Sequence, residues 1–187
     1  MVTIIFSDAQ DNDCELILRK LEEIPNTFIR RFIHITPDND VDEEDINSAI
    51  AEETDTLLLI GHGTWNGLLG PKRNGEYIIH QYNACAIAAK YVVCIWCYAV
   101  DFARKYIKNA TIAATGMFIS NPDEARDNGI DDTVSNIDDA CNKFYAKIFA
   151  VIFCADAIED YYRISKYPTE SPVDQFNKGN CRILLAM

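Results

Sequence analysis

Two reactive residues, His62 and Cys97, each follow a short apolar run of the chain. The run 56–60 leads into a Gly-His-Gly triplet around His62, and the run 91–96 leads directly into Cys97. Short apolar runs bounded by turn signals are typical of buried strands, and ligands bind at the carboxyl ends of strands in an open parallel sheet. A histidine and a cysteine at two such ends would face each other across one cleft, which is the minimal equipment for nucleophilic catalysis by a thiolate.

The residues beside this pair fit the same chemistry. Gly63 follows the histidine and has no side chain, so its backbone N–H is open to a substrate carbonyl oxygen. A helix-like segment follows Cys97, so the N–H of Cys97 would supply the second donor of an oxyanion hole. The same helix start would favour the thiolate form of Cys97. We therefore expect His62 and Cys97 to be catalytic, with Gly63 and Cys97 forming the oxyanion hole.

Cys94 and Cys97 form a C-x-x-C pair, which raises two further hypotheses, a redox site and a zinc site. Zinc needs about four ligands, and the sequence has no second C-x-x-C pair and no His-rich partner. A dithiol redox site has both sulfurs at the strand-to-helix turn, whereas period-two alternation sends Cys94 to the opposite face from Cys97. We expect no metal and no cofactor. The other cysteines are expected to fill the core: Cys14, Cys85, Cys141, Cys154 and Cys181.

Two other histidines are alternative general bases. His34 lies near the end of a predicted strand and stays open as a candidate, while His80 follows a predicted hairpin. Both are interpreted as structural or solvated residues. The aromatic residues Trp65, Trp96 and Tyr98 flank the proposed centre, where aromatic rings line a substrate groove or pack the core.

Strands that alternate with helices must position these residues. The expected strands are 2–6, 27–35, 56–60, 91–96, 110–119 and 181–185. The expected helices are 11–23, 42–52, 81–90, 98–108, 135–150 and 154–164, with Asp11 or Asn12 as the first N-cap and Ser135 as a later one. An Asn-Gly pair predicts a hairpin excursion at 65–79, and 121–132 and 167–180 are expected to be loops. This alternation predicts one α/β domain over 1–187, a three-layer sandwich with a mostly parallel central sheet.

The composition narrows the class of protein. The 187 residues are 49% hydrophobic, which is enough for one domain with a sizeable core. The formal charge of −12 disfavours nucleic-acid binding, which needs basic residues, and is compatible with a cationic peptide substrate. No apolar run is long enough to span a membrane, and the first residues do not resemble a signal peptide. Seven cysteines then favour a reducing, cytoplasmic location.

These motifs resemble those of the caspase-like cysteine peptidases, which include caspases, legumains, gingipains, clostripain, separases and the bacterial CHAT domains. The resemblance covers about 2–164 and is most convincing over 56–119, where an apolar strand ends in Gly-His-Gly and a second one ends in a cysteine. The later segment 142–145, Asn-Lys-Phe-Tyr, looks like the Phe-Tyr segment of CHAT-type domains. The resemblance implies a caspase-like fold and a thiol protease.

By position, His62 matches the catalytic histidine of this family, Cys97 its nucleophile and Gly63 its oxyanion-hole glycine. The family uses a His–Cys dyad without a metal in the chemistry. Its specificity pocket is built in part by the loop that corresponds to 116–123, so Ser120 and Asp123 are candidate pocket residues, together with Tyr98. Tyr98 departs from the small or polar residue that usually follows the cysteine. The implied activity is a cysteine endopeptidase acting on polypeptides, with a regulatory protein partner that presents substrates or gates activity.

Two other classes of function stay open. The first is a catalytically inactive caspase-like module that binds other proteins, an interpretation motivated by Tyr98. The second is a flavodoxin-like binding protein, which would need a glycine-rich phosphate loop after the first strand. The segment 7–11 has no glycine and is acidic, so the sequence gives the second class little support.

Overall fold

A six-stranded sheet forms the centre of the computed structural model, which describes residues 1–39, 41–72, 74–152 and 171–184. The strand order is β2-β1-β3-β7-β8-β9, with β9 alone antiparallel to its neighbour. The bounds are β1 (Val2–Ser7), β2 (Ile29–Ile35), β3 (Thr56–Gly61), β7 (Tyr91–Ile95), β8 (Thr111–Thr115) and β9 (Cys181–Leu184). The mostly parallel α/β sheet expected from the sequence is confirmed.

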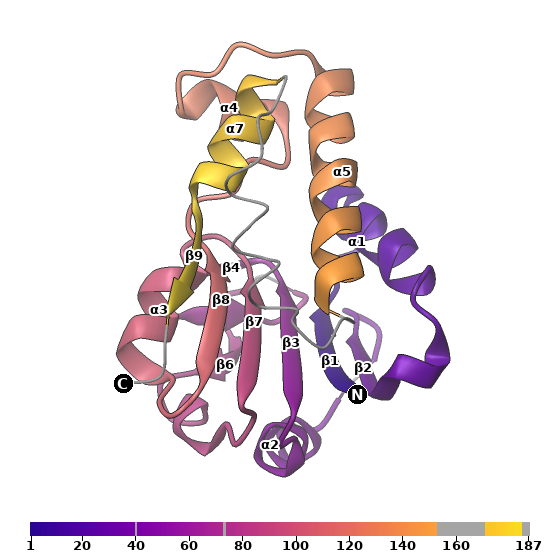
Figure 1. Cartoon of the computed structure of the whole chain (residues 1–187), viewed down its shortest axis with the longest axis vertical. Helices are drawn as coiled ribbons and strands as arrows, with labels where there is room; N and C mark the ends of the chain where they lie inside the picture. Colours follow the sequence, from indigo (N-terminus) through magenta and orange to yellow (C-terminus); the bar gives the residue numbers. More distant parts are fainter. Residues whose placement is uncertain (40, 73, 153–170, 185–187) are drawn as a thin grey trace.

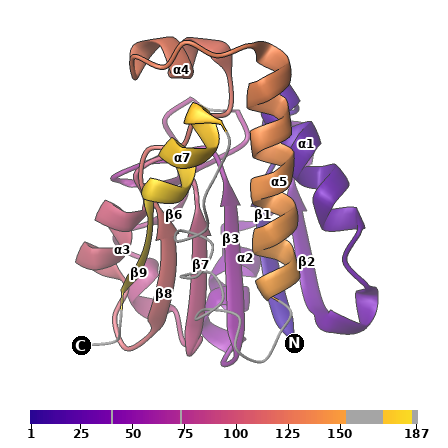
Figure 2. The same ribbon diagram turned by 45° about the horizontal axis from the view of Figure 1, so that its top comes forward.

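Helices cover both faces of this sheet (Figure 1). They are α1 (Asn12–Glu22), α2 (Glu43–Glu52), α3 (Ala99–Tyr106), α4 (Pro122–Asp127), α5 (Val134–Ile152) and α7 (Pro172–Gly179). Side chains of α1, α4, α5 and α7 share one apolar core with one face of the sheet, and those of α2 and α3 share a second core with the other face. Figure 2 shows α5 and α7 on the near side of the strands. None of the described helices is long and apolar enough to cross a membrane.

A small antiparallel sheet interrupts the alternation after β3. It consists of β4 (Gly63–Thr64), β5 (Gly67–Leu69) and β6 (Tyr77–His80), in that order. The excursion expected at 65–79 is therefore present. The indole Nε1 of Trp96 donates to the carbonyl oxygen of Thr64 at 3.0 Å, which fastens β4 to the end of β7.

The helix expected at 81–90 was a wrong prediction. Its alanines favour a helix by propensity, but the chain forms turns and a short 3₁₀ helix, η2 (Ala84–Ala86). The Asn83 side chain accepts from the N–H of His80 at 2.8 Å and donates to the carbonyl of Ile78 at 2.9 Å. These side-chain bonds to the backbone close a turn, which competes with the helix.

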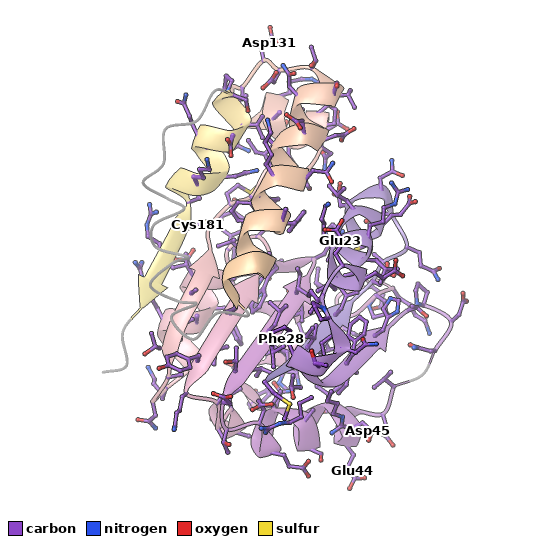
Figure 3. All side chains as sticks on the ribbon, turned by 45° about the vertical axis from the view of Figure 1, so that its right-hand side comes forward. Glu23, Phe28, Glu44, Asp45, Asp131 and Cys181 are labelled. Carbon is purple, nitrogen blue, oxygen red and sulfur yellow. The ribbon has the colours of Figure 1, made fainter. Side chains whose placement is uncertain are left out.

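Two helices lie where loops were expected, α4 within 121–132 and α7 within 167–180. Each begins with an N-cap side chain and a proline in its first turn: Asn121 accepts from the N–H of Glu124, and Ser171 accepts from the N–H of Asp174. This is the start signal of a helix, and it was readable from the sequence. Cys181, labelled in Figure 3, lies where α7 meets β9.

Three boundaries also differ from expectation. The strand expected at 110–119 ends at Thr115, and 3₁₀ helix η1 (Asn26–Phe28) precedes β2 where strand was expected from 27. Helix α5 begins at Val134, and the Thr133 hydroxyl rather than Ser135 accepts the N–H of Asn136, at 3.2 Å. The helix expected at 154–164 lies outside the described residues.

Candidate active site

The sheet places His62 and Cys97 at equivalent positions of neighbouring strands. β3 and β7 pair in parallel with Ile60 opposite Ile95, and each candidate residue follows two positions later. Both therefore leave the same edge of the sheet, at the carboxyl ends of adjacent parallel strands. Both side chains are partly buried. The two-strand juxtaposition expected from the sequence is present.

A carboxylate that the sequence marked only as a helix cap lies against the histidine. Asp11 Oδ2 lies 2.8 Å from His62 Nε2, and the Asp11 side chain also caps α1 by accepting the N–H of Cys14 at 3.0 Å. Burial raises the pKa of Asp11, but the Cys14 N–H and the His62 imidazole outweigh burial, so the net pKa lies below its ordinary value. Asp11 is therefore an ionised hydrogen-bond acceptor at neutral pH.

This contact selects one form of the imidazole. A carboxylate only accepts hydrogen bonds, so it is satisfied when Nε2 of His62 carries a proton. In the neutral ring the other nitrogen, Nδ1, is then the basic one, because the tautomer is set by the hydrogen bond that its partner nitrogen makes. The arrangement leaves Nδ1 of His62 to exchange a proton with a nearby group.

The backbone of Gly63 is held where a side chain would not fit. A Cβ at this position would lie 2.1 Å from Cδ1 of Trp96 and 2.6 Å from the carbonyl oxygen of Gly67. Leu69 donates its N–H to the His62 carbonyl at 2.9 Å, which makes these two residues a hydrogen-bonded pair. Hydrogen-bonded and non-bonded pairs alternate along an antiparallel ladder, so the next pair, Gly63 with Leu68, is non-bonded. The Gly63 N–H is thus directed away from β5.

The turn that carries Cys97 is fixed from both sides. The Thr115 hydroxyl, buried on β8, accepts the N–H of Trp96 at 3.1 Å and lies 2.7 Å from its carbonyl oxygen, to which it donates. Tyr98 donates its N–H to the Gly116 carbonyl at 3.0 Å and adopts a left-handed conformation, with φ of 65°. A non-glycine residue in this region is strained by about 1–3 kcal/mol and persists only where its surroundings enforce it. The sharp turn projects Cys97 from the sheet edge.

Replacing Thr115 by valine is expected to lower the free energy of unfolding by about 2 kcal/mol, because the N–H and C=O of Trp96 would lose a buried partner. Chemical denaturation measures this change. Thr111→Val, at the partly buried start of the same strand, is the matched control and should cost less than about 0.5 kcal/mol. Equal losses for the two variants would contradict the role given to Thr115.

The two thiols of the C-x-x-C pair lie on opposite faces, as expected. Cys94 belongs to the core beneath α2 and α3, and burial raises its pKa far above the ordinary value. Cys97 packs at the margin of the other core, where its Sγ lies 3.5 Å from the carbonyl oxygen of Phe118. The rings of Phe144 and Tyr145, from α5, pack against Phe118 at centroid distances of 4.6 and 5.6 Å. Helix α5 thereby supports the loop that contacts the candidate nucleophile.

The three expected pocket residues each have partners of their own. The Ser120 hydroxyl lies 2.8 Å from a carboxylate oxygen of Asp13 and 2.9 Å from one of Glu124, so it is engaged between α1 and α4. Asp123 is exposed on α4, 3.0 Å from Arg126. Tyr98 is partly exposed, and its ring meets the exposed indole of Trp65 edge-on, at a centroid distance of 5.8 Å.

The other two histidines have different partners. His34 Nε2 lies 2.8 Å from Oδ2 of Asp8, and its ring stacks on those of Phe6 and Phe32. His80 lies 3.7 Å from Glu43. His34 and Asp8 thus form a second histidine–carboxylate pair, at the end of β2.

A third side chain joins the histidine–carboxylate pair of the candidate site. A sulfur of Cys14, a carboxylate oxygen of Asp11 and a ring nitrogen of His62 all lie within 4.8 Å of one another, and no other such group of possible metal ligands occurs among the described residues. Cys14 is fully buried, and burial raises the pKa of its thiol far above the ordinary value. No spacing signal in the sequence marks this group, because it is the pairing of β1 with β3 that places the loop 8–11 beside His62.

A comparison of the chain with protein-family models and with curated proteins finds no match. The fold and the site geometry therefore carry the functional argument. They define an α/β protein with a histidine and a cysteine at neighbouring strand ends.

Proposed function

We propose that this chain is a caspase-like cysteine endopeptidase. The observation that carries the proposal is the placement of His62 and Cys97 two residues beyond the paired Ile60 and Ile95, with Asp11 holding Nε2 of the histidine. A thiol nucleophile, a base and a group that orients the base are the elements of a catalytic triad. The proposed location is the cytoplasm, where thiols stay reduced.

In the proposed mechanism Nδ1 of His62 takes the proton of the Cys97 thiol, and the resulting thiolate attacks the carbonyl carbon of the scissile peptide bond. The developing oxyanion accepts hydrogen bonds from the N–H groups of Gly63 and Cys97. His62 protonates the leaving amine through Nδ1, and a thioester to Cys97 remains. His62 then takes a proton from water, the resulting hydroxide attacks the thioester, and the acid product leaves with the thiol restored.

We assign substrate recognition to Tyr98, Trp65 and Asp123. Tyr98 directly follows Cys97 and packs against Trp65; both rings are exposed, and aromatic side chains bind both apolar groups and cations. The net charge of −12 favours encounter with cationic peptides. Asp123 is the proposed partner of a basic substrate side chain, and it would exchange Arg126 for that group on binding.

A second candidate function is a caspase-like module that binds proteins without cleaving them. The strained Tyr98 favours it, because a bulky, exposed ring packed on Trp65 directly follows the nucleophile, where the caspase-like peptidases usually have a small or polar residue. Such a module keeps the fold and needs no activated thiol.

The experiment that separates the two is a peptide-library digestion by the purified protein, read by mass spectrometry. The peptidase proposal predicts cleavage after a restricted set of residues and a covalent adduct on Cys97 with a peptidyl acyloxymethyl ketone. Absence of both cleavage and adduct in the folded protein would favour the binding module.

Asp11 is expected to be a positioning residue whose charge and cap functions can be separated. Asp11→Asn keeps a good N-cap but removes the charge, whereas Asp11→Ala removes both. Both variants should lower turnover by about 10²–10⁴-fold, the contribution of acid–base catalysis, with a changed pH profile. Only Asp11→Ala should also lose about 1 kcal/mol of stability.

The matched control is His34→Gln, which breaks the second histidine–carboxylate pair of the same edge. It should leave turnover unchanged. A loss of turnover in His34→Gln with none in Asp11→Asn would transfer the role of the general base from His62 to His34.

A further inference from the structure

We propose that Asp11, Cys14 and His62 form an inhibitory site for Zn²⁺. The predicted inhibition rests on the proposed peptidase function, whereas the predicted binding of zinc is independent of it. The three donors are a carboxylate oxygen, a thiol sulfur and an imidazole nitrogen, a set that suits zinc. Asp11 lies in the loop after β1, Cys14 lies in the first turn of α1, and His62 directly follows β3.

The distances are close to those of a zinc site. Zinc bonds of about 2.0–2.3 Å in a tetrahedron place ligand atoms roughly 3.3–3.6 Å apart. Here all three atoms lie within 4.8 Å, and the 2.8 Å from Asp11 Oδ2 to His62 Nε2 spans a hydrogen bond that the metal would replace. Side-chain movements of about 1 Å convert one arrangement into the other.

The surroundings supply further features of a metal site. The Cys14 N–H holds the Asp11 carboxylate, and the Ala9 N–H lies 3.4 Å from the Cys14 sulfur, so two ligands already have outer hydrogen-bond partners. Such partners orient metal ligands and strengthen binding. Asp8 lies near enough to Cys14 to oppose its ionisation, so it adds negative charge that favours a divalent cation.

The proton balance explains why bound zinc would inhibit peptide hydrolysis. The Cys14 thiol loses its proton to solvent as the zinc–sulfur bond forms. Zinc takes the lone pair of Nε2 on His62, so the ring proton moves to Nδ1. Catalysis needs the opposite tautomer, with Nε2 protonated toward Asp11 and Nδ1 basic. Bound zinc therefore blocks the proton transfers assigned to His62 while Cys97 stays uncoordinated.

Competition against a chromophoric zinc chelator tests the site without any substrate. The reduced protein should bind one equivalent of zinc. Cys14→Ser should lower the affinity for zinc by at least about 100-fold, since changes in outer hydrogen-bond partners alone lower metal affinity by about 10–100-fold. His62→Ala should lower it similarly. Cys141→Ser, another buried thiol of the same core, is the matched control and should bind like the parent protein.

Two further measurements fix the ligands and the consequence. Cobalt in place of zinc should give a thiolate-to-metal charge-transfer band that Cys14→Ser loses and Cys97→Ala keeps. In a peptidase assay with each protein compared with its own zinc-free rate, Cys14→Ser should resist inhibition by zinc. No bound zinc in the parent protein, or a site lost in Cys97→Ala but kept in Cys14→Ser, would overturn the proposal. Neither result depends on whether the protein cleaves peptides, so the two proposals fail separately.

Discussion

Cys97→Ala is expected to abolish peptide hydrolysis, lowering turnover by about 10⁴-fold or more, because removal of a catalytic nucleophile leaves only binding and oxyanion stabilisation. Folding should be retained, because Cys97 is partly buried at the margin of its core and alanine removes one atom. Steady-state kinetics on a peptide selected from the library gives the ratio.

The matched control for this variant is Cys85→Ala. The expectation that Cys85 fills the core was wrong, because this thiol is exposed in the 3₁₀ helix η2, outside the site. Cys85→Ala should behave as the parent protein. Hydrolysis that survives in Cys97→Ala, at the parent rate and after removal of contaminating proteases, would assign the activity to another residue.

Gly63→Ala is expected to lower the free energy of unfolding by about 3 kcal/mol, a large loss for one added methyl group. The new Cβ would collide with the buried Trp96 ring, which cannot turn aside without losing its bond to Thr64, and with the backbone oxygen of Gly67. The hairpin would have to lift from β7, and turnover should fall together with stability.

Denaturant unfolding measures the loss, and Gly179→Ala provides the comparison. A Cβ at Gly179 meets nothing within 4 Å, so alanine there should be neutral or slightly stabilising. A Gly63→Ala protein as stable as the parent would show that β4 does not pack against Trp96 as described.

Much of the fold was predictable because its signals are local. The continuous apolar runs that became β1, β3 and β7 are buried on both faces, as central parallel strands are. The opposite orientations of Cys94 and Cys97 followed from period-two alternation. Helices α4 and α7 were missed although an N-cap residue and a proline mark both starts. The helix expected at 81–90 failed because side-chain bonds to the backbone compete with alanine propensity.

The candidate site was predictable only in part. His62, Gly63 and Cys97 stand next to strand ends, so their neighbourhood follows from sheet topology. Asp11 was recognised as a helix cap, but its contact with His62 joins residues 51 positions apart and depends on β1 lying beside β3. The left-handed backbone of Tyr98 had no local signal in the sequence. It is enforced by hydrogen bonds made by Thr115, at the end of β8, and by Gly116, which follows β8.

The most direct test of the central claim, that His62 activates Cys97, is the rate of iodoacetamide alkylation of each cysteine, followed by mass spectrometry across pH. The exposed Cys85 is the internal standard for an ordinary accessible thiol. The account predicts that Cys97 reacts faster than Cys85 at neutral pH despite its lower exposure, and that His62→Ala slows Cys97 by at least about 10-fold while Cys85 is unchanged. Alkylation of Cys97 at or below the rate of Cys85, and indifferent to His62→Ala, would contradict the proposed peptidase site.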